Sequence, residues 1–98
     1  MNSLLLKALT SLSNTCNKSS LQAVDEDRIK VTFRAIHRNK VPVNPAEIEQ
    51  WLLSNNWQPK PVESIVTWAK TISSGGKLPL KNKDLVPTEK EVWAKLNP

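Results

Sequence analysis

The side chains of this sequence that could carry out catalysis are few and match no known motif. Cys16 is the only cysteine and His37 is the only histidine. A cysteine thiolate next to an imidazole can act as a nucleophile, but no local motif marks either residue for that role. Structural zinc sites use about four nitrogen, sulfur or oxygen ligands, and the sequence holds no cysteine or histidine pair to begin one. We therefore expect no metal site and no nucleophilic catalysis.

Asp25, Glu26 and Asp27 could act as paired carboxylates, which is the other chemistry that the residue types suggest. Each residue of a helix advances by about 100° around the axis, so three successive acids point in different directions. These acids also stand where a helix is expected to begin, and carboxylates at that end are stabilised by the helix dipole. They are therefore assigned to a helix start, and we expect a protein that is not an enzyme and binds no cofactor.

Basic residues outnumber acidic ones, with 14 lysines and arginines against nine aspartates and glutamates and a net charge of +5. Lys30, Arg34 and Arg38 are spaced to form a row along one side of a helix, and such a row could follow phosphate groups in a salt-sensitive way. The row could instead be a solvated helix face that Glu26 partly balances. Weak, salt-sensitive nucleic-acid binding is thus the alternative function. Its candidate contact residues are Arg28, Lys30, Arg34, Arg38, Lys77, Lys81 and Lys83.

The elements that must position these side chains are predicted to be helices. A proline is followed by a glutamate two residues later and then by a tryptophan in three sets, namely Pro45, Glu47, Trp51; Pro61, Glu63, Trp68; and Pro87, Glu89, Trp93. Proline suits the first turn of a helix because its fixed φ is helical and its missing N–H would lack a partner there. A carboxylate in that turn faces the positive end of the dipole. Each set therefore indicates a helix start that carries an indole toward a core.

Apolar residues at three- and four-residue spacing predict the extent of the helices. The expected helices are residues 2–15, 24–39, 45–55, 61–74 and 88–96. Asn44 and Thr88 are expected N-caps, and Gly75 with Gly76 is expected to end the fourth helix. No segment alternates as a half-buried strand would. We therefore predict an all-α fold in which residues 1–98 form a single domain, a compact irregular or orthogonal array of four to five short helices.

Trp57 and the connection 77–86 allow two interpretations. Trp57 lies in a corner between two expected helices, where it could pack as a hydrophobic plug or stand out as an interface anchor. Leu78 and Leu80 lie beside lysines, and they could cover the core as a strap or form an exposed recognition segment. An exposed patch of these three residues would suit an unknown protein partner. The leading hypothesis is accordingly a small protein-protein interaction or regulatory module without enzymatic activity.

The N-terminal segment and the cysteine content bear on location. Lys7 interrupts the run Leu4, Leu5, Leu6, and no cationic segment precedes that run, which disfavours a secretory signal. No apolar stretch approaches the ~20 residues of a membrane-spanning helix. A lone thiol fits a reducing compartment. We therefore expect a cytoplasmic protein without a membrane span.

The whole chain resembles a known family, and one stretch of it does so most clearly. Asn55-Asn56-Trp57-Gln58-Pro59, through Trp68-Ala69-Lys70, to Gly75-Gly76-Lys77 is similar to the YoaC-like family of small enterobacterial proteins. The resemblance implies a small, all-helical, cytoplasmic bacterial protein from a family that has no assigned activity. It implies no functional residues, so the function must be argued from the side chains themselves.

Overall fold

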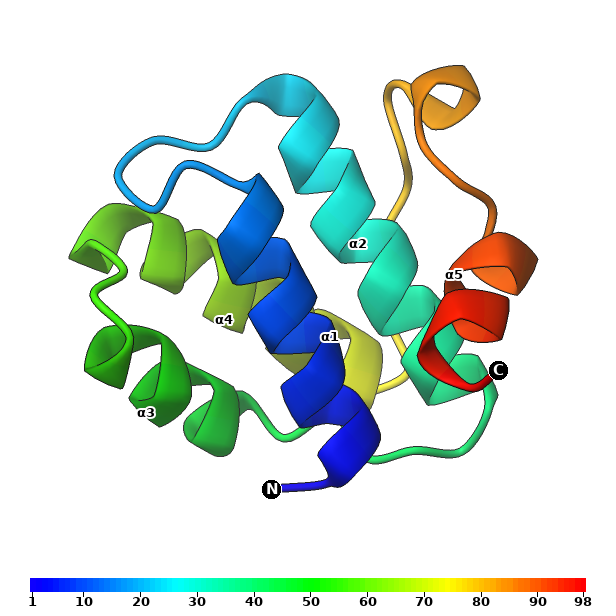
Figure 1. Ribbon diagram of the computed structural model, residues 1–98, viewed down its shortest axis with the longest axis horizontal. Helices are drawn as coiled ribbons and strands as arrows, with labels where there is room; N and C mark the ends of the chain where they lie inside the picture. Colours follow the sequence, from blue (N-terminus) through cyan, green and yellow to red (C-terminus); the bar gives the residue numbers. More distant parts are fainter.

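Helices account for all the regular secondary structure of the computed structural model, which describes residues 1–98 (Figure 1). They are α1 (Ser3–Thr15), α2 (Ala23–Arg38), α3 (Pro45–Ser54), α4 (Pro59–Ser73), the short 3-10 helix η1 (Lys83–Leu85) and α5 (Glu89–Leu96). The predicted all-α fold is confirmed. The fourth helix begins at Pro59 rather than at Pro61, because a proline is also tolerated in the first turn, where no N–H has a helical partner.

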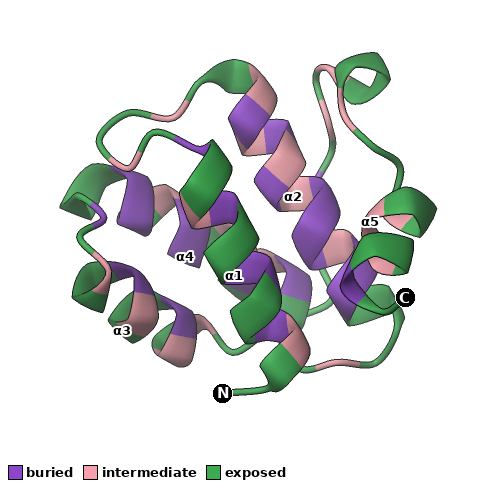
Figure 2. Cartoon of the chain, viewed as in Figure 1, coloured by how far each residue is buried: buried purple, intermediate pink, exposed green.

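The second helix stands at the centre of the arrangement. It contacts α1, α4 and α5, whereas α3 packs mainly against α4. Ile29, Phe33 and Ile36 recur along one face of α2 and are completely buried. The other helices turn their apolar faces toward this row, so the buried positions lie on the inner side of each helix (Figure 2). The overall extents of 29 × 27 × 26 Å are those of a compact globule.

Side-chain caps fix the starts of two helices where the sequence predicted them. Asn44 Oδ1 accepts a hydrogen bond of 3.2 Å from the N–H of Glu47 at the start of α3. At the start of α5, Thr88 and Glu91 form a reciprocal capping box, in which each side chain accepts a backbone N–H of the other residue. These caps satisfy N–H groups that have no partner within their helices.

The C-terminal ends of three helices share one backbone conformation. Lys40, Asn56 and Gly75 adopt positive φ angles of 65°, 69° and 87°, and each follows the last turn of α2, α3 or α4. The next residue in each case donates its N–H to a carbonyl five residues earlier, at 3.2, 3.1 and 2.8 Å. This pattern is the Schellman motif, which glycine favours and which a side chain with a Cβ tolerates at a cost. The glycine at the end of α4 was predicted, whereas Lys40 was not.

Trp57 is a hydrophobic plug and not an interface anchor. Only 3% of the residue is exposed, and its indole Nε1 donates a hydrogen bond of 2.9 Å to Ser13 Oγ on α1. The positive φ of Asn56 turns the chain sharply after α3 and directs Trp57 into the core. Lys18 holds the same corner, because its Nζ donates to the carbonyl of Asn55 at 2.9 Å.

The connection from α4 to α5 covers the core. Leu78 is buried, with 5% of its surface exposed, and Leu80 is half-buried. The proposed exposed patch of Trp57, Leu78 and Leu80 is therefore wrong as a surface. The physical reason is that Trp57 and Leu78 bury their apolar side chains against the helices, which is more favourable than exposing them to water.

Asp27 ties this connection to α2. The carboxylate is almost completely buried, and its Oδ2 accepts the backbone N–H groups of Lys81, at 3.0 Å, and of Asn82. Asp25 and Glu26 lie in the first turn of α2, as predicted from the helix dipole. The assignment of Asp27 to the same role was wrong, because its partners lie more than 50 residues away in the sequence.

Replacing Lys40 with glycine should stabilise the fold. The left-handed conformation costs a residue with a Cβ about 1–2 kcal/mol, and the greater entropy of an unfolded glycine offsets part of the gain. We expect the free energy of unfolding in urea to rise by up to about 1 kcal/mol. Gly75→Ala is the matched control, since its added Cβ would meet no atom within 4 Å and only backbone strain would act. A stabilised alanine variant, or a destabilised glycine variant, would contradict this account.

Removing the carboxylate of Asp27 should loosen the connection that follows α4. Asp27→Ala leaves two backbone N–H groups without their acceptor, and we expect a loss of about 2 kcal/mol in the free energy of unfolding. The amide protons of Lys81 and Asn82 should exchange with solvent faster in the variant than in the wild type. Glu26→Ala is the control, because Glu26 accepts no such bonds, and it should leave the exchange of both amides unchanged.

Candidate functional site

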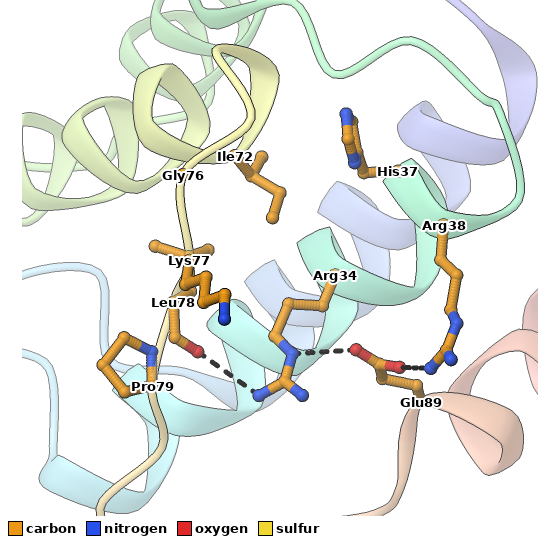
Figure 3. A pocket seen from close by; sticks show the side chains of 9 residues that line it. All are labelled: Arg34, His37, Arg38, Ile72, Gly76, Lys77, Leu78, Pro79 and Glu89. Carbon is orange, nitrogen blue, oxygen red and sulfur yellow. Dashed lines mark hydrogen bonds and ion pairs between the residues drawn. The ribbon is translucent and has the colours of Figure 1, made fainter.

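Two arginines and one glutamate form a bridge between α2 and α5. Arg34 Nε lies 2.8 Å from Glu89 Oε1, and Arg38 Nη1 lies 2.6 Å from Glu89 Oε2. Arg34 also donates from Nη1 to the carbonyl of Leu78, at 3.3 Å. Each carboxylate oxygen thus has its own guanidinium, and Arg34 is held on two sides. Figure 3 shows this chain of contacts.

Local sequence chemistry explains why these groups meet. Arg34 and Arg38 stand one helical turn apart, so they project from the same side of α2. Glu89 is the first residue of α5, directly after the Thr88 cap, where a carboxylate also faces the positive end of the helix dipole. Packing of α5 against α2 then brings the acid to the two arginines.

The environment of Glu89 keeps its carboxyl group ionised. Burial by itself raises the pKa, since only 17% of the side chain is exposed. The hydrogen bonds and positive charges of Arg38 and Arg34 outweigh that effect and lower the pKa below its usual value. Charge-assisted hydrogen bonds of this kind are stronger than neutral ones.

An open hollow of about 540 Å³ lies on one side of this bridge, and we call it the basic hollow. Its lining residues are Arg34, His37, Arg38, Ile72, Gly76, Lys77, Leu78, Pro79 and Glu89 (Figure 3). The side chain of Lys77 reaches toward Arg34 from the connection after α4, while His37 stands on the α2 side. Lys77 is exposed and takes part in none of the protein's four ion pairs.

A second hollow, of about 510 Å³, shares the same bridge. It is lined by Val31, Arg34, Arg38, Leu80, Lys83, Asp84, Pro87, Thr88, Glu89 and Lys90. The cations of the two hollows together form what we call the basic face, which consists of Arg34, Arg38, Lys77, Lys83 and Lys90. Carboxylates on this face are limited to Asp84 and Glu89, so positive charge is in excess.

The structure separates the predicted anion contacts into two groups. Arg28 lies 3.2 Å from Asp25, and Lys30 Nζ lies 5.0 Å from the centroid of the Trp68 ring. Each residue of the expected row Lys30, Arg34 and Arg38 therefore has a partner within the protein, which is Trp68 for Lys30 and Glu89 for both arginines. Arg34, Arg38, Lys77 and Lys83 come together on the basic face, and Lys81 is exposed on the same connection.

Glu89 and Lys90 are the members of the site that sequence reasoning missed. The sequence identified Glu89 only as a carboxylate at a helix start. That position is compatible with the ion pairs to Arg34 and Arg38 but does not predict them. A signal was present in residues 28–43, which hold five basic side chains and no acid. Such a segment needs either solvent or an acidic partner from elsewhere in the chain.

Of the other candidates for chemistry, Cys16 lies outside this site, whereas His37 lines the basic hollow. Cys16 is buried at the end of α1, and burial followed by the negative charge of Asp25 raises the pKa of its thiol. His37 lies in the last turn of α2 and Cys16 follows the last turn of α1, so the two residues are at opposite ends of the antiparallel pair of α1 and α2 (Figure 1). No group of three or more histidine, cysteine, aspartate and glutamate side chains is arranged to hold a metal ion. None of the helices has the length and apolar character needed to cross a membrane.

Comparison with known families covers nearly the whole chain. The family model described as a domain of unknown function, DUF1889, matches residues 1–97. The chain belongs to the DUF1889 family. Neither a curated protein nor a solved structure matches it. The DUF1889 match includes all five α-helices, so the bridge between α2 and α5 lies within the family domain.

Neutralising Glu89 should reduce the stability of this DUF1889 domain in a pH-dependent way. The pKa of Glu89 is lower in the folded protein than in the unfolded chain, where it is near 4.5. The contribution of Glu89 to the free energy of unfolding is therefore fully present above the unfolded pKa and is lost as the pH falls through the folded pKa. Glu89→Gln should therefore be less stable than the wild type by about 1 kcal/mol at neutral pH, after allowance for solvent screening of the partly exposed arginines.

The measurement is urea unfolding of both proteins between neutral pH and pH values below the folded pKa. We expect the difference in unfolding free energy to shrink toward zero at the acidic end. Glu63→Gln is the matched control, because Glu63 is an exposed acid of α4 that forms no ion pair. A difference that stays constant with pH would show that the charge of Glu89 is not responsible.

Proposed function

We propose that this protein is an interaction module without enzymatic activity, which binds an acidic segment of a partner protein through its basic face. The observation that carries the proposal is the Arg34–Glu89–Arg38 bridge, with an open hollow on each side of it. The five cations of the basic face stand against two carboxylates, which leaves three positive charges uncompensated. An acidic ligand would be steered toward this face by its field.

The arginines of the bridge are ordered before any partner arrives. Arg34 is held between Glu89 and the carbonyl of Leu78, so its side chain has already lost much of its rotamer freedom. A ligand that contacts Arg34 therefore pays little ordering entropy for it. The bridge also demonstrates which chemistry suits these guanidinium groups, because a carboxylate matches their planar array of donors.

The lining of the two hollows favours a polypeptide over a nucleic acid. Pro79, which is exposed, and Leu80, which is half-buried, give them apolar surface on which side chains of a peptide could pack. No tryptophan, tyrosine or phenylalanine lines either hollow, whereas proteins that bind single strands usually stack bases on such rings. Leu85, which is 69% exposed on η1, adds a further apolar group beside the second hollow.

The proposal also includes the cellular location and the source of the protein. We place the protein in the cytoplasm, which suits its single, unpaired thiol. The resemblance of the whole chain, and especially of residues 55–77, to the YoaC-like proteins supports a bacterial, enterobacterial source. Nucleic-acid binding by Arg28, Lys30, Arg34, Arg38, Lys77, Lys81 and Lys83 is the alternative that the experiment must separate.

The test is a titration of the protein into two fluorescently labelled ligands, a glutamate-rich peptide and a single-stranded oligonucleotide, followed by anisotropy. Titrations at about 50 mM and 200 mM salt reveal the electrostatic share of binding. Lys77→Ala with Lys83→Ala removes two cations of the basic face. The matched control is Lys60→Ala with Lys70→Ala, which removes the same charge from exposed positions on α4 outside both hollows.

We expect the peptide to bind at the lower salt concentration, and we expect the basic-face variant to weaken it about tenfold, because two charge-assisted contacts are lost. The control variant should bind nearly as the wild type does. Equal losses in both variants would show nonspecific attraction and contradict the proposal. Tighter binding of the oligonucleotide than of the peptide, with the same dependence on Lys77 and Lys83, would replace it with the nucleic-acid alternative.

A further inference from the structure

We infer that the basic hollow is a subsite for a phosphate monoester group, which Arg34 and Lys77 contact directly and Arg38 supports from the flank. This inference deepens the proposed function and rests on it, because it specifies the anion that the acidic partner would present there. The hollow could take the group from a phosphorylated side chain of the partner or from a small phosphorylated molecule. Both sources share the same recognition chemistry.

The charge balance of the hollow fits a dianion. Arg34, Arg38 and Lys77 line it together with a single carboxylate, that of Glu89, which is ionised. Three cations and one carboxylate leave the hollow with a net charge of +2, although Arg34 and Arg38 share Glu89 as their ion-pair partner. A phosphate monoester carries a charge of about −1.5 to −2 at neutral pH and would balance this net charge, whereas a carboxylate would balance only half of it.

The donors in the hollow are available without breaking the fold. Arg34 uses Nε for Glu89 and Nη1 for the carbonyl of Leu78, and its Nη2 has no partner in the protein. Lys77 is exposed and unpaired, and its side chain extends toward Arg34 (Figure 3). A fixed guanidinium and a mobile ammonium are complementary, because the first provides a planar set of donors and the second can close on whatever the first binds.

The volume and the apolar lining of the hollow indicate that the phosphate would belong to a larger organic molecule or to a peptide. A volume of about 540 Å³ exceeds what a phosphate ion fills and lies in the range of pockets for organic ligands. Pro79 is the exposed member of an apolar lining whose other residues, Ile72 and Leu78, are buried, and the group that carries the phosphate would pack against Pro79.

The experiment is a titration of isotopically labelled protein, followed by amide chemical shifts, with three ligands. They are inorganic phosphate, a peptide with one phosphoserine, and the same peptide with glutamate in place of the phosphoserine. Lys77→Ala tests the subsite without removing a hydrogen bond or an ion pair within the protein. Lys60→Ala is the control, because it removes the same charge at the opposite end of α4.

We expect shifts at residues 76–79 and around Arg34 with inorganic phosphate and with the phosphopeptide. The phosphopeptide should bind about tenfold more tightly than the glutamate peptide, since a dianion balances the net charge of the hollow more fully than a carboxylate does. Lys77→Ala should remove most of this advantage, and Lys60→Ala should keep it. Arg34→Lys should also reduce it, because the charge remains while the planar donors are lost.

Failure of this inference can be told from failure of the proposed function. If both peptides bind with equal affinity at the basic face, the phosphate subsite is overturned and the interaction module stands. If neither peptide binds but inorganic phosphate shifts the residues of the hollow, the subsite is supported as one for a small molecule and the protein partner is overturned. If no ligand shifts the hollow, both are overturned.

Discussion

Burial of the face of α2 that carries Ile29, Phe33 and Ile36 is the interaction on which the remaining structure depends. Each of these side chains is completely enclosed, and burying a side chain of this size stabilises a protein by roughly 1.5–3 kcal/mol. Because α2 contacts three other helices, its orientation also decides which of its polar residues meet neighbours. Arg34 lies beside the buried row and is therefore placed against α5 and the connection, where its guanidinium finds Glu89 and Leu78.

Local signals were enough to predict the helices, because each signal and its effect lie within one turn. Asn44 and Thr88 cap the helices that they precede, and Gly75 ends α4 through its positive φ. Lys40 escaped prediction because its residue type gives no hint of a left-handed conformation. There the contacts of the surrounding chain impose the turn against the preference of the residue.

The candidate site could be predicted only in part, because its decisive contacts join distant segments. The sequence showed the basic row of Lys30, Arg34 and Arg38. Glu89 lies 55 residues from Arg34, and no local sequence feature of either residue predicts that they form an ion pair. The local context of Trp57 favoured a plug but left an interface anchor open. Only the position of Ser13, which accepts the indole N–H, shows that the ring can be buried without losing a hydrogen bond.

Glu89 determines how an external anion could use this site. Its carboxylate is tethered at the start of α5, so it competes for the arginines at a high effective concentration, and a free ligand would displace it only at considerable cost. Displacement would also leave a partly buried carboxylate without its partners. An anion is therefore expected to bind beside Glu89, through the remaining donor of Arg34 and through Lys77, and the bridge persists in the complex. The bridge therefore links α2 to α5 and orients the guanidinium groups for a second anion, so α2 and α5 need not move when the hollow is filled.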